Sequence, residues 1–585
     1  MYLEATICAR RGALLLLCLS LVLPCAAPAQ TPPSVVTGQY NTFRTSANLQ
    51  EKTLTPANVS AGNFGLLFTQ VVDQSIFAQP LYVPGLTIKK KVHNVVFVAT
   101  LNNSVFAFDA DKHQVPLWHT TLGTPAVIGF YTLPVAGILS TPVIDTSSNT
   151  IFVVTLTDES GSSVYRLHAL NLLTGVEIAN ILIAAAVPGT GDDSQTTACV
   201  AANGGSVPAP CIPFIAGEQL QRPALLESDG SIYVAFGTLS GKEATTHYHG
   251  WLIGYTYSGN VFTPLAMFNT TQNATQTGQA CSGTNPPANQ CGHGGGIWMS
   301  GRGPAVDTTG IYMVTGNGGY GGPGTGNWAE SVLRVDGTGV VDDSYTPTNY
   351  ASLNAVDLDL GDAGAILFTS TNPNVQNLIL SAGKTGIVYV MNRASLGGFG
   401  GEGPLQSFTA TSKPCGTGPG QSGCYEIHSP AYWGSVNGTS MLYIWAYGDV
   451  MRVWDFNPAT NQFQADANQG TVTAANYPGA GLAISSNGDN DGIVWAIVPT
   501  TNSNQSQGQG ALYAFDASNV TSQLFASTDY WYATRFTIPT VANGKVYVPT
   551  SISPYPVTPK YTPALRVYGL LQTGAAHAAV KAPLN

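Results

Sequence analysis

Residues 95–109, VVFVATLNNSVFAFD, hold the most informative pattern in the chain. β-Branched and aromatic residues fill both halves, and a short Asn-containing break separates them, which is typical of two antiparallel strands joined by a tight turn. The second half ends at Asp109, and Trp118 follows after a polar segment. We therefore predict a β-hairpin with a tryptophan at a set distance behind it.

The same pattern recurs along the rest of the chain, and self-similarity of this kind is typical of propellers and solenoids. A strand-like segment with an early proline precedes the copies, as in Gln79-Pro-Leu-Tyr-Val83, and proline is tolerated where a strand begins. Helical periodicity is almost absent. We predict an all-β fold, an eight-bladed β-propeller of four-stranded antiparallel blades. The other seven copies are 151–171, 232–257, 311–336, 378–392, 442–455, 493–516 and 546–568.

The repeats also predict the domain organisation. One propeller is expected over residues 30–572, followed by a tail at 573–585. Two stacked β domains are the alternative, but repeats of this kind bury their faces only against neighbouring repeats, which favours a single ring. The length in excess of minimal blades is expected in insertions at 183–220, 263–297 and 395–428.

The first residues predict an export signal. Arg10 and Arg11 precede an apolar run over residues 13–23, and the small-residue site Ala-Pro-Ala follows at 27–29. This order predicts a secretory signal peptide over residues 1–29 and a periplasmic or secreted mature protein. No later segment holds the roughly 18 consecutive apolar residues of a membrane helix, so no membrane span is expected.

Six of the nine cysteines follow residue 30, and they form three closely spaced couples. Several pairings are open to six cysteines, and in an oxidising compartment we expect the local ones. No C-x-x-C or C-x-x-C-H motif occurs, which argues against a cysteine metal site and a covalently bound haem. The expected disulfides are Cys199–Cys211, Cys281–Cys291 and Cys415–Cys424.

Composition excludes one class of partner. Charged residues make up 9% of the chain, compared with about 25% in ordinary globular proteins. The formal net charge is −10, and no basic stripe is present. A nucleic-acid partner is therefore not expected, because its phosphates require a basic face.

Three of the copies resemble a known repeat. Residues 107–110 with Trp118, residues 169–175 and residues 514–517 are similar to the A-x-D-x-x-T-G-x-x-x-W repeat of pyrroloquinoline-quinone (PQQ) propellers. The resemblance covers most of residues 40–570. Within this class, quinoprotein alcohol dehydrogenases carry one Ca²⁺ and one PQQ on the propeller axis.

Five segments resemble elements of that site, in the family's order. They are Ser240-Gly-Lys-Glu243, Gly294-Gly-Gly-Ile-Trp298, Thr315-Gly-Asn317, Asp357-Leu-Asp359 and the segment that begins Gly383-Lys384. The resemblance implies that Glu243 and Asn317 bind calcium and that Trp298 forms the floor beneath the cofactor. Asp359 would add a carboxylate oxygen to the expected calcium shell on chemical grounds. The resemblance further implies that Asp359 is the catalytic base and that Lys384 contacts the quinone oxygen.

The residue types suit this chemistry in their own right. Ca²⁺ prefers carboxylate and amide oxygens, and an indole offers a flat face to a tricyclic quinone. A carboxylate can remove an alcohol proton, while an ammonium group can polarise a carbonyl. His428 is a further candidate for cofactor binding if it faces the axis, although an architectural role is also open.

Structural interpretations of the same residues remain open. Trp298 could pack between blades, and Asn317 stands in a Thr-Gly-Asn-Gly turn that needs no ligand. Glu243 could be a solvated charge, Asp357 and Asp359 could cap turns, and Lys384 could decorate a hairpin. His247 and His249 suggest a metal pair, but a solvated strand face explains them equally well. His293 is interpreted as a loop residue.

One departure from the family concerns cysteine. Quinoprotein alcohol dehydrogenases usually carry two adjacent cysteines over the cofactor, and this chain has no Cys-Cys pair. Ile138 to Asp145, which corresponds to that segment, contains Leu-Ser-Thr-Pro instead.

Two functions are therefore weighed. One is a Ca²⁺/PQQ-dependent dehydrogenase that oxidises an alcohol or a sugar and passes electrons to an external acceptor. The other is a non-catalytic propeller that binds protein or glycan through its disulfide-closed insertions. The distance between the oxygens of Glu243, Asn317 and Asp359 discriminates between them.

Overall fold

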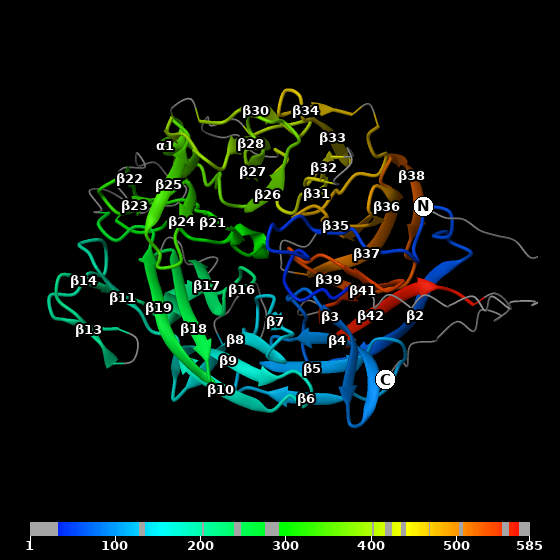
Figure 1. The fold of residues 1–585 in the computed structure, drawn as a ribbon, viewed down its shortest axis with the longest axis horizontal. Helices are drawn as coiled ribbons and strands as arrows, with labels where there is room; N and C mark the ends of the chain where they lie inside the picture. Colours follow the sequence, from blue (N-terminus) through cyan, green and yellow to red (C-terminus); the bar gives the residue numbers. More distant parts are fainter. Residues whose placement is uncertain are drawn as a thin grey trace, which may run out of the picture. The chain divides into compact units, whose positions relative to one another are not determined.

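The chain folds into a ring of β-sheets around a central axis (Figure 1). The computed structural model describes residues 33–127, 135–201, 204–238, 247–274, 292–400, 403–415, 424–434, 440–466, 468–501, 507–552 and 561–572. Within these ranges, eight sheets of at least four strands follow one another as blades. The predicted eight-bladed propeller of antiparallel blades is confirmed.

Blades 1 to 4 run from the innermost strand outwards. Blade 1 contains β3 (Leu81–Ile88), β4 (Lys91–Ala99), β5 (Ser104–Asp109) and β6 (Trp118–Thr121). Blade 2 contains β7 (Val143–Asp145), β8 (Thr150–Glu159), β9 (Ser162–Asn171) and β10 (Glu177–Leu182). Blade 3 contains β16 (Leu226–Ser228), β17 (Ser231–Thr238), β18 (Trp251–Ser258) and β19 (Val261–Asn269), and the short β15 (Gln219–Leu220) also pairs with β17. Blade 4 contains β20 (Ala305–Asp307), β21 (Gly310–Val314), β24 (Val332–Val335) and β25 (Val341–Thr346), with β29 (Gly398–Phe399) added at its edge.

Blades 5 to 8 complete the ring. Blade 5 contains β26 (Ala365–Thr369), β27 (Asn377–Ala382), β28 (Ile387–Asn392) and β30 (Gln406–Thr409). Blade 6 contains β31 (Ala431–Gly434), β32 (Ser440–Ile444), β33 (Arg452–Asn457) and β34 (Gln462–Ala465). Blade 7 contains β35 (Gly481–Asn487), β36 (Asn490–Pro499), β37 (Gln507–Asp516) and β38 (Asn519–Ala526), to which β1 (Ala47–Asn48) and β39 (Tyr532–Thr534) are added. Blade 8 contains β40 (Thr540–Ala542), β41 (Lys545–Pro549), β42 (Ala564–Leu570) and β2 (Phe64–Val71).

The repeated motif has a packing role at the junction of blades 1 and 2. Trp118 donates its indole N–H to the carbonyl oxygen of Leu172 at 3.0 Å, which joins the two blades. Asn171 accepts the amides of Leu173 and Thr174 and so caps the turn after β9. Gly175 has a φ of +71° and lies directly against the Trp118 ring, where a β-carbon would clash. The acidic or amide residue, the glycine and the tryptophan of the repeat are therefore explained by turn capping and blade packing.

Blade 8 joins the two ends of the chain. Its outermost strand, β2, precedes blade 1 in sequence and pairs antiparallel with β42, from Phe64 opposite Leu570 to Val71 opposite Ala564. The ring is thus closed by hydrogen bonds between an early and a late strand. Closure leaves few unpaired strand edges.

Residues 35–50, which we call the axial segment, cross the centre of the ring, where the dark blue trace lies in Figure 1. The segment forms hydrogen bonds with inner-strand residues of all eight blades, or with residues next to them. Its tight path requires left-handed backbone at four non-glycine positions, Gln39, Tyr40, Arg44 and Ser46. The blade residues bonded to it, in blade order, are Tyr82, Ile144, Leu225, Val306, Leu367, Tyr432, Ile484 and Val541.

Two buried arginines fix the axial segment to the blades. Arg44 donates to the carbonyl oxygens of Pro304 at 2.9 Å and Gly38 at 2.8 Å. Arg302 donates to the carbonyl oxygens of Ala363 at 2.9 Å and Pro430 at 2.6 Å, and also to that of Arg44. Burial lowers the pKa of both guanidinium groups to about 9.

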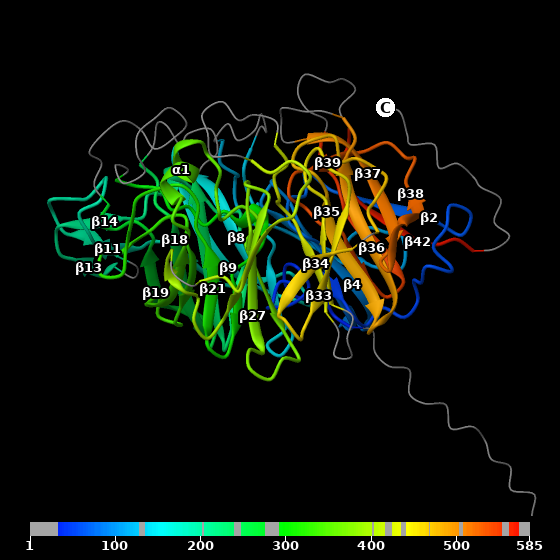
Figure 2. The same cartoon turned by 90° about the horizontal axis from the view of Figure 1, so that it is seen from above.

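The insertion between blades 2 and 3 projects beyond the ring (Figures 1 and 2). It contains β11 (Ala186–Pro188), β12 (Cys199–Val200), β13 (Ser206–Val207), β14 (Cys211–Pro213) and the 3-10 turn η3 (Ala216–Glu218). Two further short strands, β22 (Tyr320–Gly322) and β23 (Asn327–Trp328), and one short helix, α1 (Tyr350–Ala355), belong to blade 4 connections. The expected disulfides Cys199–Cys211 and Cys415–Cys424 are both formed. The third expected pair, Cys281–Cys291, lies outside the described residues, as do the signal peptide and the tail.

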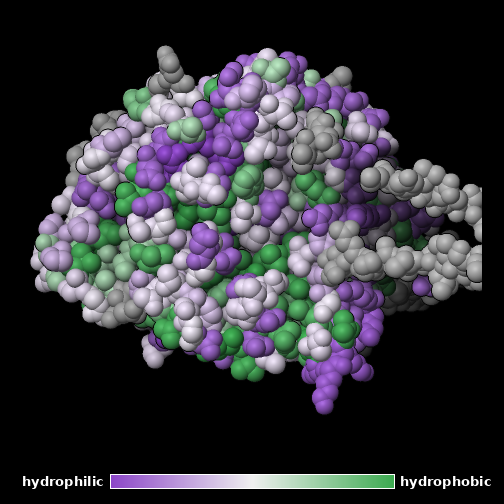
Figure 3. Space-filling model, viewed as in Figure 1, coloured by the Kyte–Doolittle hydropathy of each residue, from purple (hydrophilic) through white to green (hydrophobic). Residues whose placement is uncertain are grey.

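The outer surface is mixed in character. Figure 3 shows hydrophilic and hydrophobic residues interspersed over one face of the ring. None of the helices in the described ranges is long and apolar enough to span a lipid bilayer.

Candidate functional site

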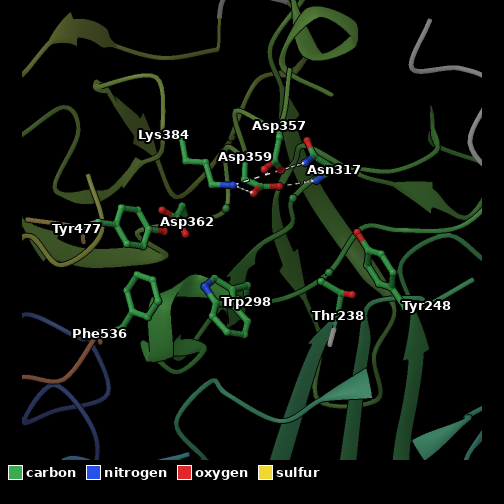
Figure 4. A pocket seen from close by; sticks show the side chains of 13 residues that line it. Thr238, Tyr248, Trp298, Asn317, Asp357, Asp359, Asp362, Lys384, Tyr477 and Phe536 are labelled. Atoms are coloured by element: carbon green, nitrogen blue, oxygen red, sulfur yellow. Dashed lines mark hydrogen bonds and ion pairs between the residues drawn. The ribbon is translucent and has the colours of Figure 1, made fainter. Parts of the chain in front are cut away.

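A cavity of about 190 Å³ lies where loops from successive blades converge (Figure 4). Its lining residues lie at strand ends and in the connections within and between blades 3 to 8. Segments from so many blades can meet only near the centre of the ring. The lining consists of Thr238, Tyr248, Gly296, Trp298, Gly316, Asn317, Asp357, Asp359, Gly361, Asp362, Lys384, Tyr477 and Phe536. Five of the predicted site residues or their motif partners, Trp298, Asn317, Asp357, Asp359 and Lys384, are among them.

Lys384 pairs with both aspartates of the Asp-Leu-Asp motif. Its Nζ lies 2.5 Å from Asp359 Oδ2 and 3.3 Å from Asp357 Oδ1. Burial alone would raise the pKa of Asp359, but the Lys384 ammonium and the Asn317 amide hold it below its usual value. Burial alone would lower the pKa of Lys384, but the two carboxylates raise it well above its usual value. Both members of the pair are therefore charged at neutral pH.

Asn317 bridges the same two aspartates from the opposite side. Its backbone N–H donates to Asp359 Oδ1 at 2.9 Å, and its side-chain Nδ2 donates to Asp357 Oδ1 at 2.6 Å. The remaining side-chain oxygen, Oδ1, is buried and has no hydrogen-bond partner among the described residues. Gly316 allows this approach, because a β-carbon there would overlap the Asp359 carboxylate. The turn interpretation of Asn317 thus holds, and one acceptor remains available in addition.

Aromatic rings form the opposite wall of the cavity (Figure 4). Trp298 precedes the buried 3-10 turn η5 (Met299–Gly301), and its ring meets that of Phe536 edge-on at 5.9 Å between centroids. Phe536 in turn meets Tyr477 edge-on at 6.0 Å. Tyr248 lies on the other side of Trp298 in this view. Trp298 therefore both packs against the core cluster shared by blades 2 and 3 and presents surface to the cavity.

His428 lies behind Asp362 and is not among the lining residues. Its Nδ1 is paired with Asp362 Oδ2, and its Nε2 lies 3.3 Å from Glu426 Oε2. Burial would lower the pKa of His428, but Asp362 and Glu426 raise it to about 9. The side chain of Ser300 also donates to Asp362 Oδ1 at 3.1 Å. His428 and Ser300 therefore hold the Asp362 side chain from its buried side, and Asp362 itself lines the cavity.

Glu330 is a second buried acid behind the site. It is fully buried, and its carboxylate accepts the backbone N–H of Leu360 at 2.7 Å. Burial and the nearby charge of Asp359 raise the pKa of Glu330 well above its usual value. Glu330 therefore fixes the backbone at Leu360, the residue after Asp359.

Several residues near the cavity were not expected from the sequence. Asp362 is in the same Gly-rich segment as Asp359, and that proximity was the one available signal. Tyr477, Phe536, Glu426 and Glu330 carried no motif. Glu243, in contrast, was predicted but lies outside the described residues.

The segment from Ile138 to Asp145, which the sequence comparison matched to the adjacent cysteines of quinoprotein alcohol dehydrogenases, does not face the cavity. No residue from Ile138 to Asp145 lines the cavity. Thr141 accepts the backbone N–H of Gln79 at 2.9 Å, and the carbonyl oxygen of Leu139 accepts a bond from Arg222 at 3.4 Å. In this chain the segment holds inner strands together.

Comparison with solved structures supports the fold assignment. The quinohemoprotein alcohol dehydrogenase from Pseudomonas putida superposes with a TM-score of 0.57 at 15% identity, over 94% of this chain and 82% of that one. A europium-containing methanol dehydrogenase gives a TM-score of 0.57 at 12% identity, over 92% and 98% of the two chains. The quinohemoprotein alcohol dehydrogenase from Comamonas testosteroni gives 0.56 at 13% identity, over 92% and 80%.

Sequence comparison adds no closer relative. No protein-family model matches the chain, and no curated protein matches its sequence. At 12–15% identity the structural likeness concerns the fold. The chain thus shares the eight-bladed propeller fold of these alcohol and methanol dehydrogenases.

Proposed function

We propose that this chain is an exported dehydrogenase that holds PQQ and Ca²⁺ in the central cavity and oxidises an alcohol or a sugar. The observation that carries the proposal is the meeting of Asp359, Lys384, Asn317 and Trp298 around one cavity, although 86 positions separate the first and last of them in sequence (384 − 298). Buried charged pairs in a cleft are typical of catalytic sites.

The oxygen atoms at the site fit a calcium ion. Asn317 Oδ1 is a buried acceptor that no described residue satisfies, and the carboxylates of Asp357 and Asp359 are held beside the same side chain. Ca²⁺ takes carboxylate and amide oxygens of this kind. Asn317 and Asp359 would hold the ion, and Glu243 is proposed as a further ligand.

The aromatic wall fits a planar cofactor. Trp298 would supply the floor, while Phe536 and Tyr477 would enclose the edge. Lys384 would contact a polar atom of the cofactor, and His428 would act only through Asp362, since it is itself buried behind that residue. When bound, the quinone would serve as the two-electron acceptor and Ca²⁺ as a Lewis acid.

The protein's own groups have separate tasks in this proposal. Asp359, kept ionised by Lys384, accepts the proton of the substrate hydroxyl at a carboxylate oxygen. Lys384, kept protonated, stabilises negative charge that develops on a neighbouring oxygen. The aromatic wall limits access of water to these charges. Electrons leave to an external acceptor, because the sequence contains no C-x-x-C-H haem motif.

Reconstitution tests the proposal. Chelator-treated protein is titrated with PQQ and Ca²⁺, and quinone absorbance is followed together with dye reduction on alcohols and aldoses. We expect stoichiometric binding that requires both components, and dye reduction with at least one substrate class. Trp298→Ala should abolish quinone binding, whereas Trp454→Ala, on blade 6 and outside the cavity lining, should retain it. Absence of bound quinone at micromolar PQQ would refute the proposal.

A further inference from the structure

A second cluster of metal-binding residue types lies outside the cavity lining. Asp192, His247 and His293 each offer one ligand atom, and these atoms lie within 4.8 Å of one another. None of the three lines the central cavity. They belong to three separate segments: the insertion between blades 2 and 3, the segment before β18, and the Gly-rich segment that leads to Trp298.

The contacts inside the cluster show how it is built. His293 Nδ1 lies 2.8 Å from Asp192 Oδ2, and the rings of His247 and His293 are 5.2 Å apart between centroids. His247 Nδ1 lies 3.1 Å from Asp193 Oδ1, so a second carboxylate stands next to the set. Side-chain exposure falls from 50% for His247 to 18% for Asp192 and 3% for His293. The cluster is therefore anchored on one side and open to solvent on the other.

The histidine pair differs from the pair that the sequence suggested. His249 is engaged elsewhere: its Nδ1 lies 2.7 Å from Thr271 Oγ1, and its Nε2 lies 3.0 Å from the carbonyl oxygen of Asp192. Burial lowers the pKa of His249 to about 4. His249 thus positions the backbone of Asp192, and His293, interpreted as a loop residue from the sequence, takes its place beside His247.

Gly292 allows the close approach of the insertion. A β-carbon at this position would overlap the carboxylate of Asp192. The backbone N–H of Asp192 also donates to the carbonyl oxygen of Gly292 at 2.9 Å. The carboxylate is therefore held against the segment that carries His293 by backbone contacts as well as by the ion pair.

We propose that Asp192, His247 and His293 form a binding site for a divalent transition-metal ion of the zinc class. Two imidazoles and one carboxylate are ligands that zinc prefers, whereas calcium takes oxygen ligands almost exclusively. Metal–ligand distances of about 2.0–2.2 Å place tetrahedral ligands roughly 3.3 Å apart. Donor atoms that are now up to 4.8 Å apart must therefore adjust their spacing, and the 2.8 Å contact between His293 Nδ1 and Asp192 Oδ2 must open if that nitrogen binds the ion. The exposed His247 side chain can make that movement, and water completes the coordination on the open side.

Such an ion would brace one wall of the cavity. It would join the insertion that carries Asp192 to the segments that carry His247 and His293. Tyr248, the residue after His247, lines the cavity, and its ring lies 5.8 Å from that of His293. The site is independent of the proposed dehydrogenase activity, because it shares no residue with Asn317, Asp359 or Lys384.

Co²⁺ provides a spectroscopic probe for this site. Chelator-treated full-length protein is titrated with Co²⁺ in excess Ca²⁺, and visible absorption is followed, then displaced with Zn²⁺. We expect one equivalent of Co²⁺ in a coordination environment with nitrogen ligands, and a higher melting temperature with Zn²⁺. His247→Ala is the decisive variant, because a side chain that is 50% exposed can be removed with little expected effect on the fold. It should weaken Co²⁺ binding at least tenfold, as should Asp192→Asn.

Two controls separate the possible outcomes. His113→Ala removes another exposed histidine and should leave Co²⁺ binding unchanged. Asp359→Asn should also leave it unchanged, which distinguishes this site from the central cavity. Co²⁺ spectra that are absent in the wild type, or equal in the wild type and His247→Ala, would overturn the proposal and leave the cluster as an ion pair only.

Discussion

The axial segment and the central cavity are adjacent, yet their buried charges are held in opposite ways. At the axial segment, the guanidinium groups of Arg44, within the segment, and of Arg302, which binds it, are bonded mainly to backbone carbonyl oxygens. In the cavity, Lys384 is bonded to two carboxylates. The turn η5 connects the two regions, because Trp298 on one side of it lines the cavity and Arg302 on the other binds the axial segment. Carbonyl partners do not titrate, so the first arrangement is suited to rigidity; carboxylate partners can exchange protons, so the second is suited to chemistry.

The largest expected effect is on the side of the axial segment. Arg302→Met removes donors to three buried carbonyl oxygens and should lower the free energy of unfolding by about 3 kcal/mol or more, since each unsatisfied buried acceptor costs roughly 1–3 kcal/mol. Denaturant unfolding measures the loss. Lys112→Met, at a side chain that is 62% exposed, serves as the control and should change stability little. Equal stability of Arg302→Met and Lys112→Met would contradict the structural role assigned to the buried arginines at the axial segment.

Asp359→Asn sharpens the comparison on the cavity side. It removes the carboxylate proposed to accept the substrate proton and should lower dye reduction about 100-fold, within the range typical of a lost general base. The fold should remain, because Lys384 keeps Asp357 as a partner. Dye-reduction rates and circular dichroism measure the two effects. Asp491→Asn, at an exposed position near the start of β36 in blade 7, is the matched control, and a rate for Asp359→Asn equal to it would contradict the assignment.

His428 gives the cavity side a pH dependence of stability that begins near neutral pH. Asp362 and Glu426 raise its folded-state pKa from 6.5 to about 9, so its charge stabilises the folded protein fully below pH 6.5. This contribution should be lost as the pH rises through about 9. The melting temperature of the wild type should therefore approach that of His428→Gln between pH 6.5 and values above 9. A constant difference between the two proteins over this range would contradict the charge assigned to His428.

The smallest effect is expected at Asn317. Asn317→Ala removes the buried Oδ1 proposed as a calcium ligand and should weaken the Ca²⁺-dependent increase in melting temperature, with an affinity loss of about tenfold, or roughly 1.4 kcal/mol. Calorimetric titration with Ca²⁺ measures it. Asn374→Ala, at an exposed position after β26, should bind Ca²⁺ as the wild type does. Unchanged affinity in Asn317→Ala would place the ion elsewhere.

The blades were predictable because their information is local. Each copy of the strand-turn-strand pattern specifies its own sheet, and the tryptophan and glycine of the repeat, as at Trp118 and Gly175, specify the packing of neighbours. The axial segment was not predictable in this way. It binds the blades mainly through backbone groups, so its side chains carry no periodic pattern that could reveal the contacts.

The residues of the candidate site show the same difference between local and long-range information. Residues within recognisable motifs, Asn317, Asp359 and Lys384, do meet in the cavity. Phe536 and Tyr477 join them only because the ring brings blades 6 to 8 opposite blade 4, which no local pattern encodes. The calcium role of Glu243 stays a prediction, as does the cofactor role of His428.

The position of β2 and the axial segment also constrains the order of assembly. Residues 64–71 are synthesised long before their partners at 564–570, and Asn48 waits equally long for Val541. These contacts close loops that span most of the polypeptide, and loop closure of this length must precede the gain from the contacts themselves. A nascent chain therefore carries β2 unpaired until its last blade emerges. The contacts of the axial segment with blade 8 likewise form only at the end of folding, although that segment comes first in the sequence.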